Sequence, residues 1–119
     1  MKFFKLAVLT CGLSIAAAAA ELPKSVLHII TMKYKEGSTP ADKTKVMEAT
    51  KKMAAAFPGI TRLWFKTIKV QVEGMTDLIV MEFKDEKAFA DYTTHPAHKA
   101  WEAVYLPLRG ESNTQDATN

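Results

Sequence analysis

Apolar residues recur along the chain with spacings that predict both strands and helices. Over residues 26–34 they alternate, which places His28, Ile30 and Met32 on one face of a strand and the intervening residues on the other. Both faces are largely apolar.

A helix is predicted from Thr39 onward. Thr39 supplies an N-cap hydroxyl, Pro40 occupies the first helical position, and Asp42 follows at the third. Pro58 and Gly59 end this segment. Between these signals the positions that share the inward face recur at helical spacing: Val46, Thr50, Met53, Ala54 and Phe57.

The remaining elements follow from turn signals. A second strand is predicted over residues 60–72, a turn at Gly74, and a third strand over residues 78–83, antiparallel to the second. Asp85 can cap a short helix that runs through Tyr92. A proline at residue 96 then opens a further helical turn that extends to residue 105.

The C-terminal tail leaves the last element open. A fourth strand belongs at residues 112–118, but every residue there except one alanine is polar. With that strand, the order is β-α-β-β-α-β. This order predicts an α+β fold of the ferredoxin-like type.

The N-terminus has the pattern of a secretory signal peptide. Lys2 and Lys5 precede an apolar run from Leu6 to Ala20, whose last residues, Ala18-Ala19-Ala20, form an A-x-A cleavage site before Glu21. The run is short and alanine-rich for a membrane span, so an uncleaved anchor is the weaker alternative. We expect a signal peptide over residues 1–20, a domain over residues 21–119, secreted or periplasmic localisation, and no stable membrane insertion after cleavage.

Composition narrows the possible functions of residues 21–119. Cys11 lies within the predicted signal peptide, so the expected mature domain has neither a disulfide nor a thiol. Removing Lys2 and Lys5 lowers the formal net charge from +3 to +1, and Arg62 and Arg109 are the two arginines in the sequence. The sequence therefore lacks a basic stripe of the kind that would indicate nucleic-acid binding. A single small domain of this size can gain stability by forming an oligomer.

The candidate chemistry gathers in residues 91–98. Tyr92, His95 and His98 follow one another there, and a phenol with imidazoles can transfer protons near neutral pH. The third histidine, His28, lies far away in the first predicted strand. A site that uses all of them requires this strand to lie beside residues 91–98.

Several motifs together resemble a known family. They are Leu27-His28-x-x-x-Met32-Lys33-Tyr34-Lys35, Phe57-Pro58-Gly59-Ile60, Phe83-Lys84-Asp85 and Tyr92-x-x-His95-Pro96-x-His98. On these motifs, residues 25–108 resemble the stress-responsive dimeric α/β-barrel family. The resemblance implies a homodimer in which two ferredoxin-like sheets pair face to face as a barrel, with the helices outside. We expect the face that carries Ile30, Met32 and Ile79 to lack a covering element within one chain.

Residues 91–98 are also similar to the motif of the family's plant polyketide cyclases. The resemblance implies that His98 removes a proton alpha to a carbonyl while the Tyr92 hydroxyl donates to the enolate oxygen. It places His28 in the pocket, and Asp77 where those cyclases have a histidine. Two aromatic positions of the cyclase pocket are Val46 and Thr50 here, so the long-tailed plant substrate is not implied. The candidate substrate-binding residues are His28, Ile30, Met32, Asp77, Ile79 and His95.

Each candidate residue also has a structural interpretation. His98 can fix a helix by hydrogen bonding, Tyr92 and His28 can be core residues with satisfied polar atoms, and His95 can bond locally in its turn. The three histidines can hold zinc, but Pro96 constrains their geometry, and we expect no metal. Four aromatic residues suggest a haem pocket, but packing is their commoner use and no cofactor is expected: Trp64, Phe65, Phe89 and Trp101.

The sequence therefore favours a domain that binds a small-molecule ligand or has a protective role. The alternative is a cyclase- or lyase-like enzyme in which His98 is the general base and Tyr92 the hydrogen-bond donor on a carbonyl or polyketide-like substrate.

Overall fold

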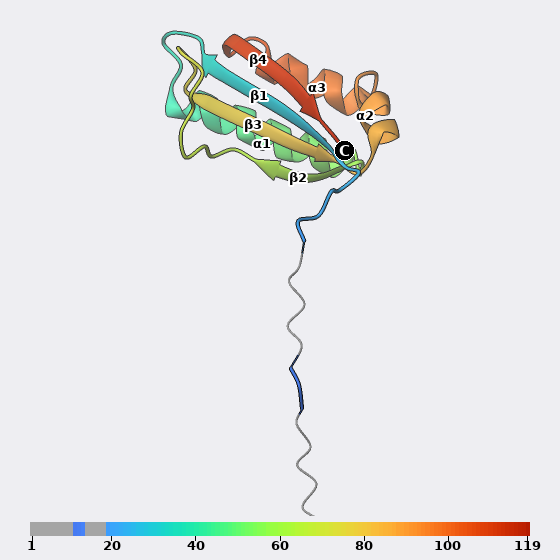
Figure 1. Cartoon of the computed structure of the whole chain (residues 1–119). Helices are drawn as coiled ribbons and strands as arrows, with labels where there is room; N and C mark the ends of the chain where they lie inside the picture. The colour runs from blue at the N-terminus through green and yellow to red at the C-terminus, as the bar shows by residue number, and fades with distance from the viewer. Residues whose placement is uncertain (1–10, 14–18) are drawn as a thin grey trace, which may run out of the picture.

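The computed structural model describes residues 11–13 and 19–119, and the elements fall in the predicted order (Figure 1). Most of the predicted signal peptide, residues 1–10 and 14–18, lies outside the described residues. No helix within the described part of the chain is long and apolar enough to cross a membrane. The elements are β1 (Val26–Tyr34), α1 (Pro40–Ala56), β2 (Ile60–Trp64), β3 (Asp77–Phe83), α2 (Glu86–Tyr92), α3 (Pro96–Tyr105) and β4 (Arg109–Ala117).

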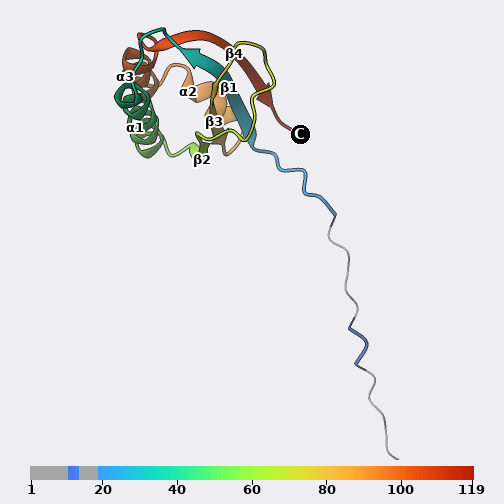
Figure 2. The same cartoon turned by 90° about the vertical axis from the view of Figure 1, so that its left-hand side faces the viewer.

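The strands form one antiparallel sheet in the order β2-β3-β1-β4. Helices α1 and α3 lie side by side on one face of this sheet, and the loop between β2 and β3 extends on the other side (Figure 2). This arrangement confirms the ferredoxin-like α+β fold. The second helix of that plan consists of two short helices, α2 and α3, separated at residues 93–95.

The starts of the helices follow from local hydrogen bonds. Thr39 accepts from the Asp42 backbone N–H at 3.2 Å, and Asp42 accepts from the Thr39 backbone N–H at 3.0 Å, which makes a complete capping box. At α2, the Asp85 carboxylate accepts from the Ala88 backbone N–H at 2.8 Å. The sequence predicted both helix starts.

The core lies between the sheet and the helices. Ile30, Met32 and Ile79 are 3%, 0% and 2% exposed within a single chain. The expectation that their face lacks a covering element was wrong, because α1 and α3 cover it. The sheet face left open carries the alternate residues of β1 and β3, among them Ile29 and Val80, which are only partly buried.

The second strand is shorter than predicted. Strand β2 ends at Trp64, and the chain from residue 65 to residue 76 has only turns and bends before β3 begins. The apolar residues that suggested a longer strand are partly solvated there: Ile68 is fully exposed and Val72 is 44% exposed. Alternating apolar residues in this segment therefore did not correspond to a paired strand.

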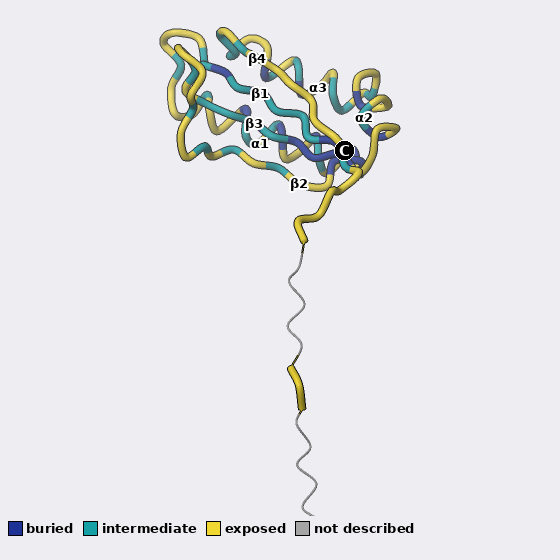
Figure 3. The backbone as a smooth tube through the Cα atoms, in the orientation of Figure 1, coloured by how far each residue is buried: buried dark blue, intermediate teal, exposed yellow. Residues whose placement is uncertain are grey.

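The polar tail does form the fourth strand. Strand β4 pairs with β1 from Leu27 opposite Ala117 to Tyr34 opposite Arg109, so it lies at the edge of the sheet. Most of its length is exposed (Figure 3). Backbone hydrogen bonds to an apolar neighbour hold it in place, and a polar edge strand also resists pairing with other chains.

Candidate functional site

Residues of β1, α2, α3 and β4 meet around a small pocket beneath the covered face of the sheet. We call it the histidine pocket. Its volume is about 150 Å³, and its main lining residues are His28, Ile30, Tyr92, His98, Tyr105 and Arg109. The structure therefore places the first predicted strand beside residues 91–98, as a site with both His28 and His98 requires.

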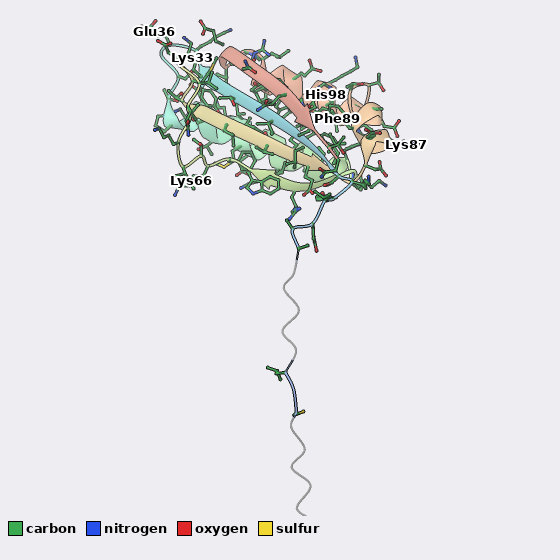
Figure 4. The ribbon with its side chains drawn as sticks, viewed as in Figure 1. Lys33, Glu36, Lys66, Lys87, Phe89 and His98 are labelled. Carbon is green, nitrogen blue, oxygen red and sulfur yellow. The ribbon has the colours of Figure 1, made fainter. Side chains whose placement is uncertain are left out.

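Helix α3 presents His98 to this pocket from its first turn (Figure 4). The His98 Nδ1 lies 3.2 Å from the Thr93 carbonyl oxygen and 3.2 Å from Glu102 Oε1. Because a carbonyl oxygen can only accept, Nδ1 carries the proton of the neutral ring and Nε2 is the basic nitrogen. The His98 side chain is 17% exposed, so solvent and small ligands can reach it.

Strand β1 supplies His28, which has its own carboxylate partner. The Nδ1 of His28 lies 2.5 Å from Oδ1 of Asp116 on β4, and the strand register places the two residues opposite each other. The ring also packs against Phe89 and Tyr92 at centroid distances of 5.6 and 6.1 Å. Asp116 therefore orients His28, and Nε2 is again the nitrogen that remains free to act on a ligand.

Tyr92, the last residue of α2, is 2% exposed and packs against His98 at a ring-centroid distance of 4.2 Å, with the two rings tilted by 43°. Its hydroxyl lies 3.7 Å from the Met81 sulfur, which is a weak acceptor. Burial raises the pKa of Tyr92, and the negative charge of Glu102 adds to this shift. Tyr92 is therefore a neutral phenol near neutral pH and can serve as a hydrogen-bond donor.

Asp77 and Met32 lie at the other end of the sheet. They pair with each other in the register, four positions along β1 from His28. Asp77 and Ile79 line a separate pocket of about 310 Å³, in which Lys43 Nζ lies 3.5 Å from the Asp77 carboxylate. The structure does not bring these residues to His98, so this group of predicted substrate contacts divides between two places.

The second pocket has its own electrostatics. Burial, followed by the charge of Asp77, raises the pKa of Tyr34 to about 12. The ammonium group of Lys43 also lies 5.2 Å from the centre of the Tyr34 ring. Tyr34 is therefore a neutral donor beside an ion pair, and it does not contribute a base.

His95 takes a local role. Its Nδ1 accepts from the Ala97 backbone N–H at 3.1 Å and caps α3, and its ring packs on Phe57 at 4.9 Å. This position agrees with the interpretation of His95 as a turn residue, and its side chain does not line the histidine pocket. Among the described residues, no group of three or more His, Cys, Asp or Glu side chains is arranged to hold a metal ion.

The four aromatic residues that suggested a haem pocket do not surround one space. Trp101 is buried in the covered core, and its indole N–H donates to the Thr50 hydroxyl at 2.9 Å, which links α3 to α1. Trp64 is 40% exposed on the open face. Phe89 packs against Phe83 at a centroid distance of 5.2 Å. Trp101 and Phe89 therefore have packing roles.

Sequence reasoning missed several residues of the site, among them Glu102, Tyr105, Arg109 and Asp116. Glu102 lies one helical turn after His98, so this spacing was a usable signal that the sequence analysis did not use. Asp116 and Arg109 lie in the tail, where the register of β4 decides which side chains face the pocket. No spacing in the sequence gives that register, because β4 has no apolar alternation.

Comparisons with known proteins identify the family of the chain and support its fold. Residues 26–118 match the family described as Stress responsive A/B Barrel Domain. Olivetolic acid cyclase from Cannabis sativa is 29% identical over 84 residues, which cover 68% of this chain and 83% of that protein. An alignment of this length extends well beyond the histidine motif.

Solved structures share the fold. The hydroxynitrile lyase of Passiflora edulis superimposes with a TM-score of 0.72 at 14% identity, over 80% of this chain and 93% of that chain. A dimeric ferredoxin-like protein of unknown function from Thermobifida fusca superimposes with a TM-score of 0.67 at 22% identity, over 88% of this chain and all of that chain. At these identities the likeness establishes the fold.

Proposed function

Because the chain belongs to the stress responsive A/B barrel domain family, we propose that it binds a small molecule in the histidine pocket, with a binding or protective role. The observation that carries this proposal is the convergence of His28, Tyr92 and His98 on one pocket of about 150 Å³. A cavity of roughly this volume accepts a ligand about the size of benzene.

Titration with small carbonyl compounds, followed by NMR of the imidazole and backbone resonances, tests this proposal. We expect shifts at His28, Tyr92 and His98, and weaker binding in His98→Ala. His95→Asn is the matched control, because it removes an imidazole outside the pocket and keeps a side chain that can cap α3. Shifts of the same size in His98→Ala and the wild type would contradict the proposal.

A second candidate function is proton transfer of the cyclase or lyase type. The hydrogen bond from His98 Nδ1 to the Thr93 carbonyl supports it, because this bond makes Nε2 the base. The neutral phenol of Tyr92 is the matching donor for an enolate oxygen. Olivetolic acid cyclase and the Passiflora hydroxynitrile lyase are enzymes by name, which makes turnover a reasonable hypothesis for this chain.

Exchange of alpha hydrogens for deuterium in small ketones distinguishes catalysis from binding. If the chain is catalytic, His98→Ala and Tyr92→Phe should each slow exchange by about 10²- to 10⁴-fold. If it only binds, the wild type should exchange no faster than buffer, while the two variants still change affinity. A His98→Ala protein with full exchange activity would remove His98 from the role of base.

We also propose that the ligand differs from the long-tailed substrate of the plant cyclases. Asp77 stands where those cyclases have a histidine, and Val46 and Thr50 stand at two aromatic positions of their pocket. Asp77 is paired with Lys43, and Thr50 is bonded to Trp101, so neither offers the same surface to an alkyl tail. Binding of a long-chain polyketide analogue tighter than that of a short ketone would contradict this.

The proposed assembly is a homodimer that pairs the open sheet faces. The support is an exposed apolar surface formed by Leu27, Ile29, Leu78 and Val80, together with the dimeric state named for structural relatives. Light scattering of residues 21–119 at micromolar concentration should give twice the mass of one chain. A folded monomer under those conditions would contradict the proposal.

We further propose that the chain is exported and cleaved after Ala20. Lys2, Lys5 and the apolar run from Leu6 to Ala20 support this, because they have the order of a secretory signal. N-terminal sequencing of the exported protein should begin at Glu21. Recovery of the intact chain from the cytosol only would contradict both cleavage and secreted or periplasmic localisation.

A further inference from the structure

The end of the histidine pocket formed by α3 and β4 contains a buried donor with no partner. Tyr105, the last residue of α3, is 3% exposed and lines the pocket. Its hydroxyl makes no hydrogen bond within the described part of the chain. Leaving such a group unpaired is unfavourable, so a buried hydroxyl of this kind is normally satisfied by a ligand or water.

Arg109 lies beside this hydroxyl. Its guanidinium is 5.7 Å from the centre of the Tyr105 ring, and it lines the same pocket. In the described residues, Arg109 has no carboxylate within ion-pair distance. A partly buried, always-charged group without an acidic partner suits an anionic ligand.

A β-bulge turns Arg109 toward the pocket. Met32 pairs with Ser112, but two residues later Tyr34 pairs with Arg109, so β4 contains one extra residue in this interval. Without that extra residue Gly110 would stand opposite Tyr34, and Arg109 would point to the open face of the sheet. Gly110 suits the bulge, because a Cβ there would lie 3.0 Å from the Lys33 carbonyl oxygen.

The acidic groups near the pocket are already engaged by histidines. Glu102 Oε1 lies 3.2 Å from His98 Nδ1, and Asp116 Oδ1 lies 2.5 Å from His28 Nδ1. Arg109 is the positively charged side chain of this pocket, and it has no ion-pair partner among the described residues. The pocket volume of about 150 Å³ restricts the ligand to roughly the size of benzene.

We propose that Arg109 and the Tyr105 hydroxyl bind the carboxylate of a small organic acid, which places the rest of the ligand beside His28, Tyr92 and His98. This inference rests on the proposed function and names its ligand class. The guanidinium neutralises the carboxylate and donates to it, and the Tyr105 hydroxyl donates the bond that it lacks in the unliganded protein. Neither His98 nor Tyr92 takes part in this contact with the carboxylate.

Benzoate and benzamide are suitable probes, because they share size and shape and differ in charge. Affinity is measured by NMR titration of residues 21–119 near neutral pH. We expect benzoate to bind at least about tenfold more tightly than benzamide, since hydrogen bonds to a charged group contribute the equivalent of about 10- to 100-fold in affinity.

Two variants test the assigned residues. Arg109→Gln should weaken benzoate binding by about 10- to 100-fold and leave benzamide within about twofold. Lys99→Gln is the matched control, because it removes one positive charge from an exposed position on α3. It should leave both affinities unchanged, which separates a local contact from a general effect of net charge.

Tyr105→Phe distinguishes a hydroxyl that binds the ligand from one that only stabilises the fold. It should weaken benzoate binding by about tenfold, while the midpoint of thermal unfolding without ligand stays equal or rises, because a buried unpaired donor is lost. A lower midpoint with unchanged benzoate affinity would assign the hydroxyl to folding and overturn its role here.

The outcomes distinguish this inference from the proposed function. Equal affinity for benzoate and benzamide, with shifts at His98, overturns the carboxylate subsite and leaves small-molecule binding intact. Unchanged benzoate affinity in Arg109→Gln also overturns it. Absence of binding by either probe or by small ketones overturns both proposals.

Discussion

The two faces of the sheet are both apolar, but only one of them is fully buried within a single chain. On the covered face Met81 and Phe83 are 0% exposed beneath the helices. On the open face Val80 and Leu78 are only partly buried, and Trp64 is 40% exposed. The covered face builds the core and the histidine pocket, whereas the open face has the character of an interface with a second copy.

This difference shows what strand alternation can and cannot give. Alternation in β1 correctly separates Ile30 and Met32 from Ile29, because successive side chains point to opposite faces. It does not say which set the helices cover, since both sets are apolar. The assignment depends on the right-handed βαβ crossing that carries α1 over one face, which is a property of the whole fold.

The largest expected effect is on the covered face. Phe83→Ala removes a fully buried ring and should lower the free energy of unfolding by about 3–5 kcal/mol, measured by urea denaturation at one protein concentration. Ile68→Ala is the control on the exposed loop and should change it by about 0.5 kcal/mol or less. A loss from Phe83→Ala as small as that of the control would mean that this face is not the core.

Substitutions on the open face should affect dimerisation more than folding. Val80→Asp places a charge at the proposed dimer contact and should weaken the dimer by about 30-fold or more, the size of an interface hot spot. Analytical ultracentrifugation over a dilution series measures this, with circular dichroism as the check on folding. Thr44→Asp, at an exposed position on α1, is a charge-matched comparison away from the open face. A Val80→Asp protein that remains a dimer would place the interface elsewhere.

Local signals predicted most of the fold, and register-dependent features escaped prediction. The Thr39 capping box and the Asp85 cap are encoded within four residues, so the sequence located both helix starts. The end of β2 at Trp64 and the existence of β4 depend on pairing with strands far away in the sequence. Backbone pairing stabilises β4 despite its polar side chains, which propensity does not anticipate.

The candidate site divides in the same way. Tyr92 and His98 were found because they lie six residues apart in one motif, and the structure brings His28 to them. Arg109 and Asp116 reach the pocket only through the bulged register of β4. A sequence without alternation in that strand contains no signal for which of its side chains face inward.

A smaller effect is expected at the contact between the two covering helices. Thr50→Val leaves the buried Trp101 N–H without its acceptor and should cost about 1–3 kcal/mol of unfolding free energy. Thr50→Ser keeps the hydroxyl and should retain most of that stability. Adding Trp101→Phe to Thr50→Val should make the two losses less than additive, because the unpaired donor is removed. Strict additivity in this double-mutant cycle would contradict the hydrogen bond.

The smallest expected effect is a dependence of the unfolding free energy on acidic pH, and it arises from a residue on the open face. Glu82 is 4% exposed and accepts hydrogen bonds from Arg62 and from the Ser25 hydroxyl, the latter at 2.7 Å. The hydrogen bonds from Arg62 hold the pKa of Glu82 below its ordinary value of 4.5, although burial acts in the opposite direction.

Because the folded pKa of Glu82 is lowered, its contribution to stability is present above 4.5 and is lost as the pH falls through the lower folded value. Glu82→Gln cannot titrate, so its unfolding free energy should fall less steeply with acid than that of the wild type. Arg62→Gln should flatten the profile similarly, because it removes the main cause of the shift. Urea unfolding at a series of pH values gives both slopes, and a Glu82→Gln profile parallel to the wild type would show that this pair does not couple folding to pH.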